Sequence, residues 1–334
     1  MTVVGVVLFA FTVGWILRRY YSTQRPFPFP GIGYAGAAAL LAAEILLFAR
    51  VELVTLYFTP IAWTAYIAWA DSAVFSLRGK SLWQTRRPEF VCLALCSIPL
   101  WLIFEAYNLR LANWIYVGLP ENPFARGIGY AWSFSTIWPA IFETATLLRA
   151  LGRKDSPGGN VGADSGKSPG RNLSNAQPDA RPRGWLAPLF ILVGAVFLTV
   201  PLLVPPAIGA YLFGAVWLGF LLLLEPINLQ MQHESLWRDL LDGDYSRLTA
   251  LLAAGWVCGI FWEFWNYWAQ ARWVYVFPIW QEWKLFAMPV PGYLGFPPFA
   301  AECFVLFAFF APLLNRATGK SAEKSNLRWL ALEL

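Results

Sequence analysis

Long apolar stretches constrain the fold of this chain more than any other feature of its sequence. A helix that spans a bilayer needs about 20 mostly apolar residues, and nine stretches meet that need. The predicted spans are residues 2–18, 31–49, 51–76, 89–108, 128–150, 185–204, 206–228, 247–269 and 291–315. Of the 334 residues, 58% are hydrophobic and 13% are charged, whereas about 25% are charged in soluble domains. The sequence therefore predicts an all-α, polytopic integral membrane protein and excludes a soluble single-core protein, a disordered chain and a nucleic-acid-binding module.

The basic residues are unevenly divided between the two sides of the predicted bundle. Twenty of the 25 Lys and Arg residues fall in alternate loops, at 18–30, 77–88, 149–184, 229–247 and 316–334. Cytoplasmic loops of membrane proteins carry an excess of these residues. The N-terminus is therefore predicted to lie outside and the C-terminus inside, in the inner or plasma membrane of the cell. The net charge of +5 then reflects the inner loops rather than an anionic partner.

The chain divides into five predicted parts. Residues 1–30 hold an N-terminal transmembrane helix and a basic loop, because the first apolar stretch lacks the flanks of a removable signal peptide. Residues 31–150 and 185–315 each hold four predicted spans. The intervening segment 151–184 is rich in Gly, Ser, Pro and charged residues and is predicted to be a disordered cytoplasmic linker. Residues 316–334 are predicted to be a cytoplasmic tail.

An internal repeat relates the two groups of four spans. Asp71 and Trp83 match Glu225 and Trp237 at an offset of 154 residues, and both tryptophans end a Ser-Leu-Trp sequence. Further matches at offsets of 158 and 159 residues join Glu105 and Asn108 to Glu263 and Asn266, Trp114 and Tyr116 to Trp273 and Tyr275, and Pro139 and Glu143 to Pro298 and Glu302. Because four spans return the chain to the same side, the sequence predicts one N-terminal helix followed by two parallel four-helix repeats, about nine transmembrane helices in all.

Carboxyl groups inside the predicted spans are the main candidates for chemistry. Seven such residues have no Lys or Arg well inside a span to neutralise them: Glu44, Asp71, Glu105, Glu143, Glu225, Glu263 and Glu302. An unpaired carboxyl in an apolar interior stays protonated, and acids inside membranes mark functional sites. The alternative is that they hydrogen-bond neighbouring helices and hold the bundle together. The acids predicted to be catalytic are Glu263, Glu302, Glu105 and Glu143.

Polar and aromatic residues near these acids are predicted to bind a substrate. Asn108 and Asn266 each share a helix face with a Glu three residues earlier. Aromatic faces beside a protonated carboxyl can stabilise a carbocation, although many of the 19 Trp residues suit an interfacial belt instead. The predicted binding residues are Asn108, Asn266, Trp262, Trp265, Trp273, Tyr275, Asp71 and Glu225. No metal or cofactor is expected, because the chain has one His, lacks metal-ligand Cys spacing and contains no nucleotide-binding fingerprint.

The second copy carries a pattern with a family resemblance. It reads Trp262-Glu263, then Trp273-Val274-Tyr275, then Gly-Tyr-Leu-Gly-Phe-Pro-Pro ending at Pro298, then Glu302-Cys-Phe. This resembles the heterodimeric or fused-type lycopene cyclase domain, a family in which two polytopic domains in tandem cyclise carotenoid ends by acid catalysis without redox change. The resemblance implies that Glu263 and Glu302 are the acids of the second copy, with counterparts in the first. The chain departs from the family in having a single Glu four residues after Pro298, where the family has paired Glu directly after Pro.

Three functions remain open from the sequence. The leading hypothesis is a non-redox isomerase or cyclase of the carotenoid-biosynthesis kind, which acts on an apolar isoprenoid-type lipid by protonation. The second is a proton-coupled transporter of a lipid or small solute, because two matched halves with buried carboxyls suit alternating access. The third is a structural membrane protein without catalytic activity. The partner expected under the first hypothesis is a membrane lipid or isoprenoid substrate, and no nucleic acid is expected.

Overall fold

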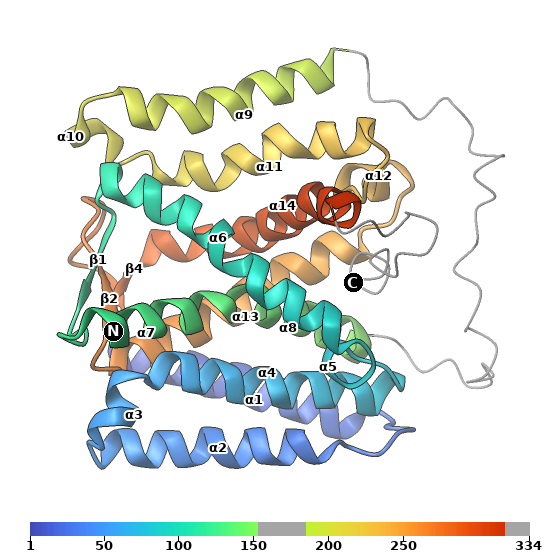
Figure 1. Cartoon of the computed structure of the whole chain (residues 1–334), viewed down its shortest axis with the longest axis vertical. Helices are drawn as coiled ribbons and strands as arrows, with labels where there is room; N and C mark the ends of the chain where they lie inside the picture. The colour runs from blue at the N-terminus through green and yellow to red at the C-terminus, as the bar shows by residue number, and fades with distance from the viewer. Residues whose placement is uncertain (153–184, 318–334) are drawn as a thin grey trace.

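The structure is a computed structural model that describes residues 1–152 and 185–317. Most of these residues form long helices that run side by side, with short strands at one end of the bundle (Figure 1). The long helices are α1 (Thr2–Ser22), α2 (Gly31–Phe48), α4 (Phe58–Arg78), α6 (Arg87–Leu111), α7 (Pro123–Ser135), α8 (Ile137–Gly152), α9 (Leu186–Leu203), α11 (Phe213–Gln230), α13 (Ser246–Trp268) and α14 (Phe296–Ala317). Apart from two residues each, the predicted linker 151–184 and the predicted tail 316–334 lie outside the described residues.

Short elements connect the long helices at the two ends of the bundle. They are α3 (Glu52–Leu56), α5 (Leu82–Thr85), β1 (Trp114–Val117), α10 (Pro206–Gly209), α12 (Leu236–Leu241), β2 (Arg272–Tyr275), β3 (Lys284–Leu285), β4 (Met288–Pro289) and the 3₁₀ turn η2 (Val290–Gly295). Helices α3 and α10 lie at the same end as strands β1 and β2, whereas α5 and α12 lie at the other end (Figure 1). We call these the strand end and the opposite end of the bundle.

Seven of the described helical segments are long and apolar enough to cross a membrane: α1, α2, α6, α9, α11, α13 and Val290–Pro312. The chain is therefore a multi-pass helical membrane protein. Helices α4 and α8 are not among the seven. Helix α8 has 16 residues and so extends only about 24 Å, whereas α4 is long enough, at 21 residues, but is not apolar enough in composition. The count of nine spans stays a prediction.

Prolines interrupt two of the predicted spans. Residues 51–76 form α3 and then α4, and residues 128–150 form α7 and then α8. A proline has no N–H to bond the carbonyl four residues earlier. The residue four positions before Pro60 is the last residue of α3, and the residue four positions before Pro139 is the last residue of α7. Each proline therefore leaves the final carbonyl of the preceding helix without that hydrogen bond. The predicted span 206–228 is also divided, into α10 and α11.

The long helices pack in a continuous series. Helix α2 packs on α4, and the series continues through α8, α13, α14 and α11 to α9. Helix α1 packs on α13, and α6 packs on α7 and α8. Two thirds of the apolar window is buried in α13 and in Val290–Pro312, at 67% each, against 11% in α1 and 17% in α9. Helices α13 and α14 are therefore the centre of the bundle, while α1 and α9 present most of their surface outward.

Strands β1 and β2 join residues that are far apart in the sequence. They pair antiparallel, with Trp114 opposite Tyr275 and Tyr116 opposite Trp273. Because alternate residues of a strand point to the same face, these four aromatic side chains share one face of the ribbon. The ribbon thus brings the Trp-x-Tyr sequences of both predicted copies into contact at the strand end of the bundle.

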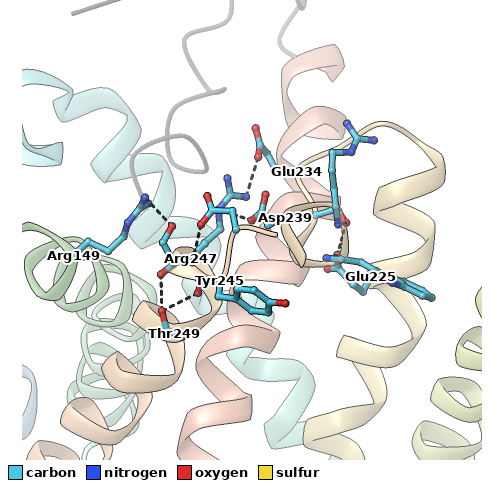
Figure 2. A network of polar contacts seen from close by, with 12 residues as sticks. Arg149, Glu225, Glu234, Asp239, Tyr245, Arg247 and Thr249 are labelled. Atoms are coloured by element: carbon cyan, nitrogen blue, oxygen red, sulfur yellow. Dashed lines mark hydrogen bonds and ion pairs between the residues drawn. The ribbon is translucent and has the colours of Figure 1, made fainter. Parts of the chain in front are cut away.

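Charged residues gather at the opposite end of the bundle. Figure 2 shows Arg247, at the start of α13, between Glu234 and Asp239, with N–O distances of 3.0 and 3.2 Å. Arg247 is 8% exposed, and its guanidinium carbon lies 5.1 Å from the ring centre of Phe304. Arg149, near the end of α8, donates to the Ser246 hydroxyl at 3.2 Å. These contacts tie α8, α12, α13 and α14 together.

The Asp239 carboxyl gives this cluster a pH dependence. Burial raises its pKa to about 6, against the opposing effect of Arg247. A carboxyl with a raised folded-state pKa stabilises the folded state below its unfolded-state pKa near 4, and this contribution is lost as the pH rises through 6. We expect the free energy of unfolding to fall by roughly 1 kcal/mol for this reason between about pH 4 and pH 7. Thermal unfolding in detergent at several pH values checks this, and Asp239→Asn should flatten the profile. An equally steep profile in the variant would assign the fall to other groups.

Candidate functional site

A cavity of about 130 Å³ lies between the two groups of helices, beneath the β1–β2 ribbon. Thirteen of its 24 lining residues are aromatic. The tryptophans are Trp63, Trp101, Trp114, Trp217, Trp262 and Trp273, the tyrosines are Tyr57, Tyr116, Tyr130 and Tyr275, and the phenylalanines are Phe134, Phe296 and Phe299. Such a wall favours an apolar ligand, or a ligand with developing positive charge that meets the aromatic faces.

Helix ends and strands supply this wall. Trp63 lies five residues, about 8 Å, after the start of α4. Trp262 lies six residues before the end of α13, and Phe296 begins α14. The rings of Trp63 and Trp262 have their centres 5.1 Å apart. The cavity is therefore at the strand end of the bundle and reaches between helices of both predicted copies.

A glutamate stands directly behind the wall on each side. The Tyr116 hydroxyl donates to Glu105 Oε1 at 2.5 Å, and Trp101 Nε1 donates to the same oxygen at 2.8 Å. On the other side, the Tyr275 hydroxyl donates to Glu263 Oε1 at 2.9 Å. Both tyrosines line the cavity, whereas neither glutamate does. The two Glu–Tyr pairs are thus equivalent in contacts and both face the same cavity.

The surroundings of the two pairs differ. Glu263 is 0% exposed, whereas Glu105 is half-buried. Trp273 Nε1 donates to the Tyr275 hydroxyl at 2.9 Å and reaches Glu263 at 3.4 Å. Burial, with the adjacent glutamate, holds the pKa of the Tyr116 and Tyr275 hydroxyls well above the usual range. Both phenols therefore keep their protons and remain donors at neutral pH.

Asn108 and Asn266, predicted to bind substrate, hold the strands instead. Asn266 Oδ1 accepts from the Trp273 N–H at 2.9 Å, and its amide donates to the Trp273 carbonyl at 2.8 Å. Asn108 makes the same two contacts with Trp114, at 3.1 and 2.8 Å. Neither asparagine lines the cavity. Each one fixes the start of a strand relative to the helix that carries the glutamate.

This positioning role makes Asn266 sensitive to substitution. Asn266→Ala removes two buried hydrogen bonds and leaves the backbone groups of Trp273 without these partners. We expect a loss of about 2 kcal/mol of stability and a displaced Tyr275. Thermal unfolding and tyrosine accessibility in the purified variant measure the two effects. A variant as stable as the wild type would show that the strand is held by other contacts.

Asp71 and Glu225, also predicted to bind substrate, lie at the opposite end of the bundle from the cavity. Asp71 accepts from the Ser81 hydroxyl and from the Trp83 N–H at 2.9 and 2.7 Å. Glu225 accepts from the corresponding hydroxyl of Ser235 and backbone N–H of Trp237. In both cases the acid anchors the turn that follows its helix. The most conspicuous matched motif of the sequence therefore has a structural use in each half.

The remaining predicted acids are buried away from the cavity wall. Glu143 is 1% exposed and hydrogen-bonds the Asp71 side chain. Two carboxyls in such contact repel each other when both are ionised. Glu302 is 0% exposed and lies near the backbone of Phe220, and among the described residues none makes a hydrogen bond of good geometry to either of its oxygens. The structure therefore separates Glu143 and Glu302 from the Glu–Tyr pairs.

Of the four aromatic residues predicted to bind substrate, three line the cavity and one does not. Trp262, Trp273 and Tyr275 line it. Trp265 is 1% exposed and packs edge-on against Trp63, with ring centres 4.9 Å apart. Its Nε1 donates to Glu44 at 3.1 Å. Trp265 therefore supports the wall from behind and joins α13 to α2.

Several cavity residues were not among those predicted from the sequence. Tyr116 had a signal there, because it matches Tyr275 in the repeat. Arg126 and Arg272 also line the cavity, and no sequence pattern distinguished them from other loop cations. Within residues 1–152 and 185–317, no three His, Cys, Asp or Glu side chains gather as metal ligands would.

On α4, two polar groups of the wall have no hydrogen-bond partner within the described part of the chain. They are the Thr59 hydroxyl and Trp63 Nε1, which lie one helical turn apart on α4. Thr59 is 6% exposed and Trp63 is 1% exposed. Buried donors normally have partners. These two can therefore hydrogen-bond an acceptor atom of a ligand in the cavity.

Comparisons with known proteins add no assignment to this geometry. The sequence matches no protein-family model, and neither the curated proteins nor the solved structures that were searched contain a significant match.

Proposed function

We propose that this protein binds an apolar, isoprenoid-type lipid in the aromatic cavity and rearranges it by proton transfer, as an isomerase or cyclase. One observation carries the proposal. Two Glu–Tyr pairs, Glu105 with Tyr116 and Glu263 with Tyr275, each place a carboxyl one side chain behind a wall made mostly of aromatic rings. The Glu263 carboxyl is buried and that of Glu105 is half-buried. This arrangement combines a proton source with surfaces that stabilise positive charge.

The proposed reaction needs only proton movement. In the structure each tyrosine hydroxyl donates to its glutamate, and for reaction this hydrogen bond reverses, with the proton on the carboxyl and the hydroxyl turned to the substrate. The glutamic acid then donates its proton to the tyrosine oxygen, while the tyrosine donates its own proton to a carbon of a substrate double bond. The carbocation that forms faces the cavity tryptophans, whose π electrons attract it. Loss of a proton from a neighbouring carbon then forms a new double bond and returns the proton to the Tyr–Glu pair. The product has the same composition as the substrate, so no oxidant or reductant is needed.

We further propose that the chain is a tandem duplication with about nine spans, its N-terminus outside and its C-terminus inside. The matched contacts of Asp71 and Glu225, and of Asn108 and Asn266, support the duplication. The excess of Lys and Arg in alternate loops supports the orientation. With this orientation, the strand end and its cavity would lie on the outer side. The resemblance of the second copy to lycopene cyclase domains supports the class of reaction.

One observation favours proton-coupled transport as a second candidate. Additional carboxyls lie beyond the cavity, where Asp71 and Glu143 contact each other and Glu225 anchors the opposite end. Carboxyls along a membrane protein can relay protons. Uptake of a lipid or solute into proteoliposomes that stops when the pH gradient is collapsed would favour this function over rearrangement.

Lipid extracts test the proposed function directly. Cells that produce the wild-type protein should contain an isoprenoid lipid that is isomeric with one accumulating in cells without the gene. Cells producing a Tyr116→Phe/Tyr275→Phe double variant at equal level should resemble the cells without the gene, because the phenylalanine ring fills the same space but cannot relay a proton. Identical extracts from all three would contradict the proposal.

A further inference from the structure

Two arginines give the otherwise aromatic cavity a strongly cationic part. Arg126 lies in the first turn of α7 and Arg272 begins β2, so each predicted copy contributes one. Both line the cavity, near the loops of the strand end. Arg126 is half-buried and Arg272 is exposed. The cavity is therefore cationic near the loops that carry Arg126 and Arg272, and aromatic deeper in the bundle, around Trp63 and Trp262.

Within the described part of the chain, neither arginine forms an ion pair with a carboxylate. In the described ranges, up to residue 152 and from 185 to 317, the ion pairs involve other residues. Arg272 uses one nitrogen for the carbonyls of Tyr267 and Ala269, both at 3.4 Å. A guanidinium has five N–H donors, so Arg272 keeps donors for a ligand. Glu105 and Glu263 do not compensate the charge, because each is turned behind its tyrosine.

Uncompensated cations at this place matter for the proposed reaction. Positive charge that develops in an apolar cavity is repelled by nearby guanidinium groups, since a low dielectric screens charges weakly. The same charges disfavour a cationic ligand, such as a quaternary ammonium, that the aromatic wall would otherwise accept. An anion bound to both arginines removes this repulsion. Arginine is suited to phosphate in particular, through its planar, bidentate donors.

We propose that the ligand of this cavity is an amphipathic isoprenoid-type lipid with a phosphate group, held at its head by Arg126 and Arg272. Its unsaturated chain lies along the aromatic wall toward Trp63 and Trp262, where the two Glu–Tyr pairs stand. This inference rests on the proposed function and names its substrate class. It also assigns a task to each end of the cavity, with recognition at the arginines and proton transfer at the tyrosines.

Binding measurements on the full-length protein test this assignment. The protein is placed in nanodiscs of neutral phosphatidylcholine, and its Trp fluorescence is followed during titration with farnesyl phosphate, farnesol or inorganic phosphate. We expect farnesyl phosphate to bind at least about tenfold more tightly than farnesol, because its phosphate adds charge-assisted hydrogen bonds. The affinity for farnesyl phosphate should fall as salt is added. Arg126→Gln and Arg272→Gln should each reduce its affinity about tenfold and leave farnesol binding unchanged. Arg50→Gln, at an exposed arginine outside the cavity, is the matched control.

The possible outcomes separate the two proposals. Equal affinities for farnesyl phosphate and farnesol, unaffected by either arginine variant, would overturn the phosphate assignment and leave the proposed rearrangement standing for a neutral lipid. Inorganic phosphate that binds as tightly as farnesyl phosphate would make the site one for free phosphate and overturn the lipid assignment. If no isoprenoid binds at all, both the assignment and the proposed function are wrong.

Discussion

Glu263→Gln is expected to reduce lipid conversion by about 10²–10⁴-fold, the usual contribution of a general acid. Glutamine has nearly the same shape and can still accept a hydrogen bond from Tyr275, so the site should keep its geometry. The amide has no acidic proton to pass to the tyrosine, and the proton relay is therefore lost. Product formation in membranes, measured beside the amount of folded protein in detergent, shows whether chemistry is lost without loss of the fold.

Two further variants show whether the loss of activity is specific to the glutamates behind the cavity wall. Glu105→Gln tests the half-buried pair in the same way, and the more affected of the two variants identifies the pair that carries more of the reaction. Glu52→Gln, at an exposed glutamate of α3, is the matched control and should be fully active. Full activity in both Glu105→Gln and Glu263→Gln would rule out proton donation by these acids.

Gly194→Leu is expected to give the largest loss of stability, roughly 2–4 kcal/mol. Gly194 of α9 faces α11 so closely that a Cβ there would lie 2.8 Å from the Gly219 carbonyl oxygen. Helices in a bilayer gain no hydrophobic energy from contact with each other and associate through close packing of small residues. Leucine at this position forces the two helices apart. The midpoint of thermal unfolding in detergent measures the loss.

Two further glycines serve as a second test and as a control for Gly194→Leu. Gly36 of α2 lies against α4 in the same manner, where a Cβ would be 2.6 Å from the Ala65 carbonyl oxygen, so Gly36→Leu should destabilise the protein similarly. At Gly14 of α1 a Cβ would meet nothing within 4 Å, and Gly14→Leu should leave the midpoint almost unchanged. Equal midpoints for Gly194→Leu and Gly14→Leu would contradict the close packing of α9 on α11.

The helical nature of the chain follows from its apolar stretches, but the ends of the helices do not. A hydropathy window averages over about 20 residues and is insensitive to a single missing N–H. Pro60 and Pro139 therefore remained inside predicted spans, although each one stands just after the start of a new helix in the structure.

The acids of the candidate site could be predicted from the sequence, but their partners and the cavity could not. Buried acids are visible in a sequence as charges within apolar stretches, so Glu105 and Glu263 were found. Their partners Tyr116 and Tyr275 lie in strands of four residues, which are too short to recognise by periodicity. The pairing of β1 with β2 joins segments more than 150 residues apart, and no local pattern predicts it. That contact brings Trp114 and Tyr116 beside Trp273 and Tyr275, and all four line the cavity.

The roles of matched residues were also hard to predict. Asp71 and Glu225 share a motif with the functional candidates, yet they anchor turns through backbone N–H groups of Trp83 and Trp237. A residue can be repeated in both halves because it holds the fold together or because it takes part in the chemistry, and the sequence pattern is the same in both cases. Only the contacts distinguish an acid behind a cavity wall from an acid that holds a loop.

Deuterium incorporation is the most direct test of proton-driven rearrangement. Membranes with the wild-type protein are incubated with a mixed isoprenoid extract in D₂O, and the lipids are analysed by mass spectrometry. A rearranged lipid should carry one deuterium at the carbon that received the proton, and it should not form with Glu105→Gln/Glu263→Gln membranes. A lipid pool that is unlabelled and unchanged with the wild-type protein, and identical to that with the double variant, would contradict the account.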